Sequence, residues 1–348
     1  MAKQSAIENL PGRPALDRPR GLAPKADPGL AVQAVGLSKY YRNPWTLKTT
    51  CGLEDLNLEI GRGEVLGYLG PNGAGKTTTL KLLTGLLKPS SGQAWLLGES
   101  IEQPASRRRL GFLPEQPYFY DYLSGMEYLV MAGRLSGLAA RQADTQARHW
   151  LGRVGLGERP ALKLRKYSKG MLQRLGLAAA LVHDPDLLIL DEPMSGLDPF
   201  GRRDVRDLII EQKQRGVTVL FSSHILPDVE LLCDRVGIVL AGRLKRVATV
   251  DEIIHGGAHR VEIDCGPGTD LEVPPMWREV MRREAQPNGT GFVLEREAML
   301  GDVLAWLLKS GASVRAVTPQ RSSLESMFMA AAGEASGDAA SEPERRMA

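Results

Sequence analysis

Residues 70–78 read Gly70-Pro71-Asn72-Gly73-Ala74-Gly75-Lys76-Thr77-Thr78, which fits the pattern G-x-x-x-x-G-K-T. An apolar run at 65–69 precedes this stretch and predicts a buried strand, and good helix formers follow it as far as Leu87. A strand, a glycine-rich loop and a helix are the context in which this pattern binds phosphate. We therefore expect the chain to bind a nucleotide through residues 70–78.

The residue types explain how such a loop would hold a triphosphate. Glycines at 70, 73 and 75 have no Cβ, so the backbone can curl around a phosphate and point its N–H groups at it. The helix that follows adds the positive end of its dipole. Lys76 is expected to meet the β- and γ-phosphates, and the Thr77 hydroxyl suits a Mg²⁺ ligand. The alternative is a glycine-rich turn that matches by chance, and the strand–helix context argues against it.

Length and composition are those of an ordinary globular protein. The 348 residues are 43% hydrophobic and 24% charged, enough for one large or two ordinary domains. A net charge of +3 favours neither nucleic acid nor an acidic membrane as an obligatory partner. The 3 cysteines are far apart and favour a reducing cytosol, without a disulfide framework or a zinc site. No signal region and no run of about 18 apolar residues is present, so we expect any link to a membrane to come through a partner.

The patterning predicts four regions along the chain. A proline-rich tail at 1–30 lacks the apolar surface needed to fold. Residues 31–250 alternate strand and helix patterns, and within them about residues 116–182 predict a helical insertion. Residues 256–330 predict a small α+β accessory domain, in which we find no catalytic constellation. Residues 333–348 are expected to be a second disordered tail.

Polar residues follow two further predicted strands. The apolar run 187–190 predicts a central parallel strand and leads into Asp191 and Glu192. Open α/β sheets bind ligands at the carboxyl ends of their strands. Asp191 is therefore a candidate to hold Mg²⁺ through water, and Glu192 to accept a proton from an attacking water. His224 follows the strand at 217–221 and is a candidate to reach the γ-phosphate, although a lone histidine is more often structural.

Five motifs in this order make the chain resemble the ATP-binding subunit of an ABC transporter over about residues 31–250. The phosphate-binding loop is the first of them, and four more follow it along the chain. Ser168 and Gly170 match the Ser and the second Gly of the family signature Leu-Ser-Gly-Gly-Gln, Asp191 and Glu192 match the Walker B aspartate and the catalytic glutamate, Ser195-Gly196-Leu197-Asp198 matches the D-loop, and His224 matches the switch histidine.

The resemblance implies an α/β fold, which is a P-loop NTPase core of ABC type with an antiparallel β subdomain, a helical insertion and a small C-terminal α+β domain. It implies ATP and Mg²⁺ as cofactors and hydrolysis of ATP to ADP and phosphate. In this family two domains meet head to tail, and each ATP lies between one loop and the partner's signature helix. Ser168 and the helix that begins near Gly170 would then grip a γ-phosphate across an interface with a second copy or a homologous subunit. Asp198 of the D-loop is also expected to contact the nucleotide. The lone subunit should be nearly inactive.

Two motifs depart from the family pattern. The signature reads Tyr-Ser-Lys-Gly-Met, so Lys169 and Met171 stand where the family has Gly and Gln, and the lysine adds positive charge near phosphate. The Q-loop position aligns best with Glu115, one place before Gln116. Either of these two residues is a candidate for the contact to Mg²⁺ and water.

The spacer after the adenine-stacking aromatic also departs from the pattern, because residues 42–52 make it longer than usual. Tyr41 fits the stacking position best, with Tyr40 and Trp45 as rivals. A packed surface aromatic is the plainer interpretation of each of these three residues.

The implied function is that of the ATPase subunit of a membrane exporter, with an integral membrane permease as a separate polypeptide. Such a subunit is cytoplasmic and sits at the inner face of the cell membrane through the permease. The aromatic run 118–122 is expected to line the socket for a coupling helix of the permease. One alternative is a soluble ABC-type ATPase acting on ribosomes or nucleic acid, but no nucleic acid is expected from the near-neutral charge and the single loop. The other is a P-loop kinase or GTPase, which needs neither the signature nor the D-loop.

Overall fold

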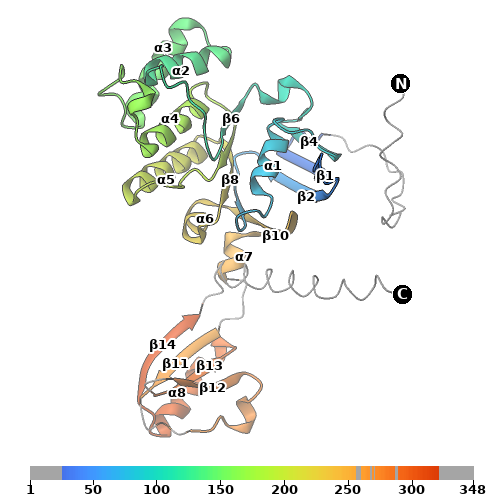
Figure 1. Cartoon of the computed structure of the whole chain (residues 1–348). Helices are drawn as coiled ribbons and strands as arrows, with labels where there is room; N and C mark the ends of the chain where they lie inside the picture. The colour runs from blue at the N-terminus through green and yellow to red at the C-terminus, as the bar shows by residue number, and fades with distance from the viewer. Residues whose placement is uncertain (1–25, 256–259, 267–268, 270, 287–288, 321–348) are drawn as a thin grey trace, which may run out of the picture.

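The computed structural model describes residues 26–255, 260–266, 269, 271–286 and 289–320 (Figure 1). The tail predicted at 333–348 lies outside these residues, as does nearly all of the one predicted at 1–30. No helix within the described residues is both long enough and apolar enough to cross a membrane.

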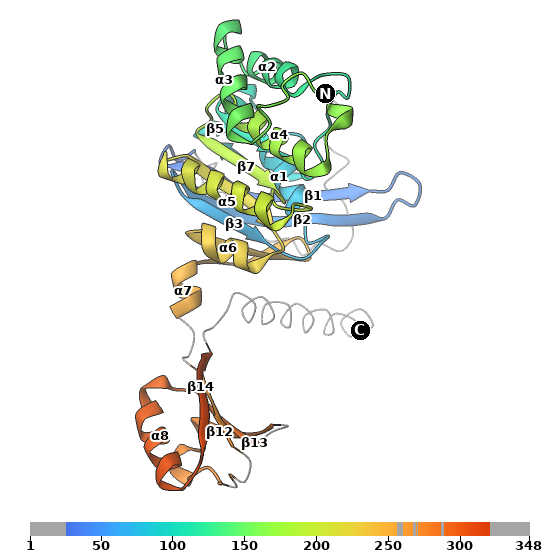
Figure 2. The same cartoon turned by 90° about the vertical axis from the view of Figure 1, so that its left-hand side faces the viewer.

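An antiparallel sheet opens the fold, with the strand order β2-β1-β4-β5. Burial alternates along β2, where Leu56, Leu58 and Ile60 are buried and the residues between them are exposed. This alternation is typical of a strand with one face on the core. The hairpin between β1 and β2 extends beyond the rest of the sheet (Figure 2). The strands are β1 (Leu30–Arg42), β2 (Thr49–Gly61), β4 (Ser91–Leu96) and β5 (Glu99–Ser100).

A second sheet forms the centre of the molecule, in the order β10-β9-β3-β8-β7-β6. Strands β9, β3, β8, β7 and β6 run parallel, and β10 pairs antiparallel with β9. All residues of β3, β7 and β8 are buried, as the unbroken apolar runs predict for strands covered on both faces. The strands are β3 (Val65–Leu69), β6 (Leu110–Leu113), β7 (Leu187–Asp191), β8 (Thr218–Ser223), β9 (Arg235–Leu240) and β10 (Arg243–Thr249).

Helices cover the central sheet on one face, and α1 with the antiparallel sheet covers the other (Figures 1 and 2). Strand β3 shows the division, because Val65 and Leu69 join the core with α4, α5 and α6, whereas Leu66 and Tyr68 pack with α1 and the antiparallel sheet. The parallel strands thus end together at one edge, next to the loop before α1. The helices are α1 (Lys76–Leu83), α4 (Lys169–Leu181), α5 (Pro199–Gln214), α6 (Leu226–Leu232) and α7 (Val250–His255).

The segment predicted as a helical insertion contains α2 (Gly125–Leu135), α3 (Ala140–Arg153) and α4. Helix α2 begins with a capping box, in which Ser124 accepts from the Glu127 N–H and Glu127 accepts from the Ser124 N–H. The short 3₁₀ helices among the described residues are η1 (Pro104–Arg107), η2 (Leu164–Lys166), η3 (Pro275–Trp277) and η4 (Glu297–Met299).

A third sheet, in the order β12-β13-β11-β14, has a hydrophobic core of its own. Val303 and Leu307 of α8 (Leu300–Lys309) are fully buried in this core together with Ile263 and Phe292. Its strands are β11 (Arg260–Cys265), β12 (Met281–Gln286), β13 (Gly289–Leu294) and β14 (Val314–Gln320). The fold is therefore the predicted α/β core with an antiparallel sheet, a helical insertion and a small α+β unit.

Candidate active site

The loop between β3 and α1 has the backbone that the glycines predict. Gly73 and Gly75 adopt φ angles of 80° and 103°, which side-chain-bearing residues rarely adopt. A Cβ on Gly75 would also lie 2.6 Å from the carbonyl oxygen of Gly52, so only glycine fits at this position. Helix α1 starts without a side-chain cap, which leaves its first N–H groups available to a ligand.

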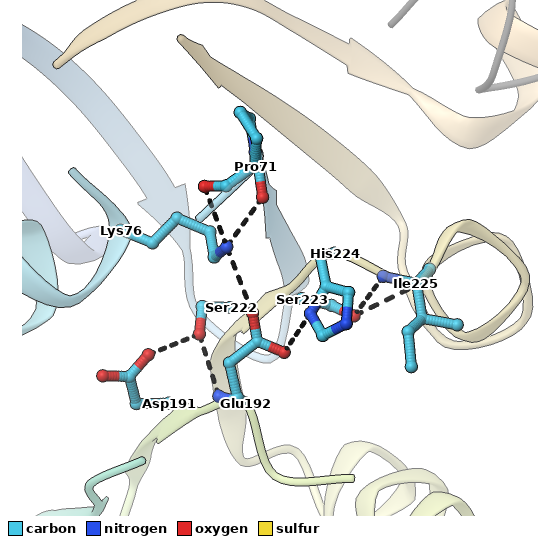
Figure 3. A network of polar contacts seen from close by, with 9 residues as sticks. Pro71, Lys76, Asp191, Glu192, Ser222, Ser223, His224 and Ile225 are labelled. Atoms are coloured by element: carbon cyan, nitrogen blue, oxygen red, sulfur yellow. Dashed lines mark hydrogen bonds and ion pairs between the residues drawn. The ribbon is translucent and has the colours of Figure 1, made fainter. Parts of the chain in front are cut away.

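Lys76 is buried and its ammonium group is engaged by the chain itself (Figure 3). The Nζ atom donates to the carbonyl oxygens of Gly70 at 2.7 Å and Pro71 at 3.3 Å. It also lies 3.1 Å from Glu192 Oε1, an ion pair without hydrogen-bond alignment, since that oxygen has no hydrogen-bond partner. The ammonium group is thus held inside the curl of the loop by oxygens of the chain itself.

Asp191 and Glu192 stand at the carboxyl end of β7, and both are buried. Ser222 joins them, because its hydroxyl donates to Asp191 Oδ1 at 2.6 Å and accepts from the Glu192 N–H at 2.9 Å. Glu192 has a φ of 50°, the left-handed region that costs a non-glycine residue about 1–2 kcal/mol. Such strain at the edge of a sheet is typical of a functional position.

His224 follows the adjacent strand β8 and reaches the same carboxylate. Its Nδ1 lies 2.9 Å from Glu192 Oε2, so Glu192 lies between the Lys76 ammonium and the His224 imidazole (Figure 3). The histidine side chain is 47% exposed, whereas that of Glu192 is 9% exposed. A water approaching this carboxylate would therefore meet an acceptor whose two oxygens are fixed from both sides.

A cleft of about 400 Å³ opens over the loop. Glu115, with which the Q-loop position aligns best, lines this cleft, whereas Gln116, the other candidate, is not among the lining residues. After β6 the backbone places the side chain of Glu115, and not that of Gln116, in the cleft beside the phosphate loop. The lining consists of Gly52, Pro71, Asn72, Gly73, Gly75, Lys76, Thr77, Thr78, Glu115 and Glu192.

Of the three candidate stacking aromatics, Tyr41 lies beside the cleft. Its hydroxyl is 3.3 Å from Thr78 Oγ1, and its ring packs against Gly52, where a Cβ would clash. Trp45 is 92% exposed in the turn of the hairpin. The Tyr40 N–H bonds to Ser90 Oγ, at the neighbouring strand. The geometry therefore favours Tyr41 for an adenine contact.

The signature and D-loop residues lie outside the cleft lining. Ser168 is exposed and caps α4, where its hydroxyl accepts from the Met171 N–H at 3.3 Å. Gly170 is in the first turn of the same helix. Asp198 caps α5 by accepting from the Gly201 N–H at 2.8 Å. These residues are brought together with each other, since a Cβ on Gly170 would lie 3.5 Å from Leu197, but the structure does not place them with the loop.

Hydroxyl and carboxylate oxygens around the cleft fit a hard divalent cation. The Thr77 hydroxyl and the Glu115 carboxylate line the cleft, and Asp191 lies buried behind Glu192. Within the described residues, no group of three or more His, Cys, Asp or Glu forms a metal cage. A hydroxyl and two carboxylates without a complete cage suit Mg²⁺, which is usually bound by one or two carboxylates, substrate phosphates and water.

Ser222 was not among the residues predicted for the site. The available signal was a serine directly after the wholly apolar residues 219–221 of a buried strand, where a hydroxyl needs a partner. A second buried hydroxyl supports the loop from behind, since Thr79 Oγ1 lies 3.2 Å from the Tyr68 hydroxyl. Burial raises the pKa of Tyr68 well above its ordinary value, so this phenol stays protonated.

Comparisons with known proteins show the family of this chain. The family described as "ABC transporter" matches residues 53–195. An uncharacterized ABC transporter ATP-binding protein of Nostoc sp. is 39% identical over 301 residues, which are 86% of this chain and 88% of that protein. The daunorubicin/doxorubicin resistance ATP-binding protein DrrA of Streptomyces peucetius is 32% identical over 90% of this chain and 96% of its own length.

A solved structure of an ATP-binding subunit of an ABC transporter agrees with these sequence relatives. It superimposes with a TM-score of 0.58 at 32% identity, covering 65% of this chain and 92% of that one. The chain therefore belongs to the ATP-binding proteins of ABC transporters, and it is an ATP-hydrolysing enzyme of that family.

Proposed function

We propose that the chain is the ATPase subunit of an ABC exporter and that it drives a permease carried on a separate polypeptide. The observation that carries this proposal is the exposed N-terminus of α4, where Ser168 lies outside the nucleotide cleft of its own chain. A nucleotide-binding motif without a nucleotide site in its own subunit suits a motif that acts on a partner. The similarity to a drug-resistance ATP-binding protein supports export, because removal of a drug from the cell produces resistance.

In the proposed reaction, Lys76 exchanges the oxygens of Gly70, Pro71 and Glu192 for those of the β- and γ-phosphates. This exchange frees Glu192 Oε1, which is otherwise paired with the ammonium group. Glu192 then accepts the proton of the attacking water, while His224 holds its other oxygen. Binding of the substrate and release of the base are thereby linked through one ion pair.

Residues near the loop would hold Mg²⁺ in this scheme. Thr77 offers its hydroxyl, Asp191 would act through water, and Glu115 is favoured over Gln116 because it lines the cleft. When bound, the cation neutralises charge on the phosphates. Tyr41 would cover the adenine beside Thr78.

The second half of the site would come from another copy or a homologous subunit. The free N–H groups at the start of α4, with Ser168 and Gly170, present a positive helix end to a γ-phosphate across the interface. Asp198, which caps the neighbouring helix α5, would lie in the same interface. ATP would close the pair and hydrolysis would reopen it, which moves the permease between its states.

An exposed group of tyrosines next to Glu115 is proposed to receive the permease. Tyr118, Tyr120 and Tyr122 are 97%, 53% and 69% exposed. Phe119 anchors the group, because its ring packs edge-on against Tyr128 of α2 with the centroids 5.0 Å apart. Exposed aromatic residues on a fixed backbone are typical of an interface. Through this contact the protein would sit at the inner face of the cell membrane.

Purification of the tagged chain from solubilised cells of its natural host tests the proposal. We expect an integral membrane protein to co-purify, and recovery of ribosomes or DNA in its place would contradict it. Tyr120→Ala should lower permease recovery and uncouple ATP hydrolysis from transport. Leu86→Ala, which removes an exposed apolar side chain elsewhere, serves as the matched control. Wild-type coupling and permease recovery in Tyr120→Ala would overturn the assignment of this surface.

A further inference from the structure

Ser222 joins Asp191 to Glu192 in the polar network of Figure 3. It lies on β8, between the strand that leads to the phosphate loop and the strand that ends in the two acids. Its neighbours in register are Tyr68 on β3 and Asp191 on β7. The side chain is completely buried. A buried hydroxyl at this position has only the adjacent strands with which to bond.

The directions of its two hydrogen bonds follow from the chemistry of the partners. An ionised carboxylate only accepts and a backbone N–H only donates. Ser222 therefore gives its proton to Asp191 Oδ1 at 2.6 Å and uses a lone pair for the Glu192 N–H at 2.9 Å. The first bond is charge-assisted, which makes it the stronger of the two.

The bond from the Glu192 N–H to the Ser222 hydroxyl holds the backbone of Glu192 in place. Glu192 has a left-handed backbone with φ of 50°, and its N–H is anchored by Ser222. Its carboxylate then reaches Lys76 on one side and His224 on the other. The direction in which the carboxylate leaves the backbone thus depends on the same hydroxyl that orients Asp191.

We propose that Ser222 is a positioning residue that ties Asp191, on the metal side of the site, to Glu192, on the side of the attacking water. This inference rests on the roles proposed above for Asp191 and Glu192. A movement of either carboxylate is passed to the other through one oxygen atom. Metal affinity and turnover therefore depend together on Ser222, whereas phosphate binding by the loop does not.

Three variants separate this role from a merely structural one. Ser222→Ala removes both hydrogen bonds, and Ser222→Thr keeps the hydroxyl. Thr218→Val is the matched control, because Thr218 is buried on the same face of the same strand and accepts from the Gly63 N–H at 2.8 Å, away from the cleft. It removes a buried acceptor of a backbone N–H without touching either acid.

The measurements are the ATPase kcat, nucleotide affinity in EDTA, and Mn²⁺ affinity by electron paramagnetic resonance with a non-hydrolysable ATP analogue. Loss of a charge-assisted bond predicts a decrease of about tenfold in both kcat and Mn²⁺ affinity for Ser222→Ala. Nucleotide affinity in EDTA should not change, and Ser222→Thr should restore both quantities. Thr218→Val should lower the unfolding temperature and leave both quantities at the wild-type level.

Wild-type kcat and Mn²⁺ affinity in Ser222→Ala would overturn the inference, and so would a Thr218→Val protein with both losses. If Ser222→Ala does not fold, Ser222→Cys, which replaces the hydroxyl with a weak donor and acceptor, allows the same comparison. The experiments also distinguish a failure of this inference from a failure of the role proposed for Glu192. Glu192→Gln at the wild-type rate would remove the base role, whereas a slow Glu192→Gln beside an unaffected Ser222→Ala contradicts the inference alone.

Discussion

The cleft over the phosphate loop and the N-terminus of α4 both carry motifs that are expected to bind the same nucleotide. The two regions differ in how far their side chains are buried and bonded within the chain. At the cleft, Lys76, Glu192 and the adjacent Asp191 are buried and held by hydrogen bonds or ion pairs within the chain. At α4, Ser168 and Lys169 are exposed, and the Ser168 hydroxyl caps its own helix. The first region is therefore preorganised within one chain. The second is an exposed surface, and in the proposed dimer its groups would gain a ligand when the other subunit covers them.

The turn after Glu192 contacts the first turns of α4. The buried Gln173 of α4 donates to the carbonyl oxygen of Pro193, directly after Glu192, at 3.0 Å. The Lys169 side chain lies over Gly196, where a Cβ would come within 2.6 Å of its ammonium nitrogen. The start of α4 is therefore in contact with the turn that follows Glu192. The two regions therefore differ in solvent exposure but lie next to each other in the fold.

Glu192→Gln is expected to have the largest effect. It removes a carboxylate from the cleft and leaves the residues of α4 unchanged. Loss of a general base lowers a rate by about 10²–10⁴-fold, so we expect ATP hydrolysis to fall within that range. ATP binding should persist or tighten, because Lys76 no longer pairs with a carboxylate. Phosphate release and size-exclusion chromatography with ATP measure the rate and the accumulated dimer. Hydrolysis at the wild-type rate would show that another group takes the proton.

Ser168→Gly addresses the other region and should have an intermediate effect. Glycine at a helix N-cap costs only a few tenths of a kcal/mol relative to serine, so the fold should be nearly unaffected. Loss of a hydrogen bond to a charged phosphate predicts a decrease of about tenfold in ATP-driven dimer affinity. Sedimentation of the Glu192→Gln protein with and without this change measures it.

The matched control for that change is Ser124→Gly, which alters the cap of α2 in the same way. It should leave the dimer affinity as it was. Equal weakening by both variants, or no weakening by Ser168→Gly, would mean that α4 is not part of a shared site.

Much of the cleft could be predicted from the sequence because local patterns determine it. The glycines of the loop and the apolar runs of β3 and β7 specify a turn and two buried strands, and parallel strands bring their carboxyl ends to one edge. Asp191, Glu192 and His224 followed from that rule. The α/β fold with its antiparallel sheet and helical insertion was likewise implied by the resemblance.

The rest depends on neighbours that are distant in the sequence. Ser222 bonds to acids 31 and 30 positions away, which requires that β8 lie beside β7. The choice between Glu115 and Gln116 depends on how the backbone leaves β6, and no periodic pattern reports that direction. The ion pair of Lys76 with Glu192 joins the first and third motifs and appears only once the sheet order is known.

The smallest effect concerns how the segment leading to Ser168 is held. Glu127 bonds to the Ser124 N–H, and its carboxylate lies 3.0 Å from the Lys163 ammonium, five residues before Ser168. The bond from the Ser124 N–H, and then the Lys163 ammonium, lower the pKa of Glu127 from 4.5 to about 2. Because the folded state favours the carboxylate, its stabilising contribution is complete above pH 4.5 and is lost as the pH falls towards about 2.

Glu127→Gln should therefore lower the unfolding temperature slightly at neutral pH, and the difference from wild type should shrink between pH 4.5 and pH 2. Both groups are substantially exposed, so solvent and salt screen the pair and the effect stays small. Thermal unfolding of both proteins across that range measures it, and Asp144→Asn, which breaks the exposed pair with Arg148 on α3, is the control. A difference that is constant with pH would mean that the carboxylate charge contributes nothing here, and that the approach to α4 is held by backbone bonds such as Leu164 N–H to Leu123 O.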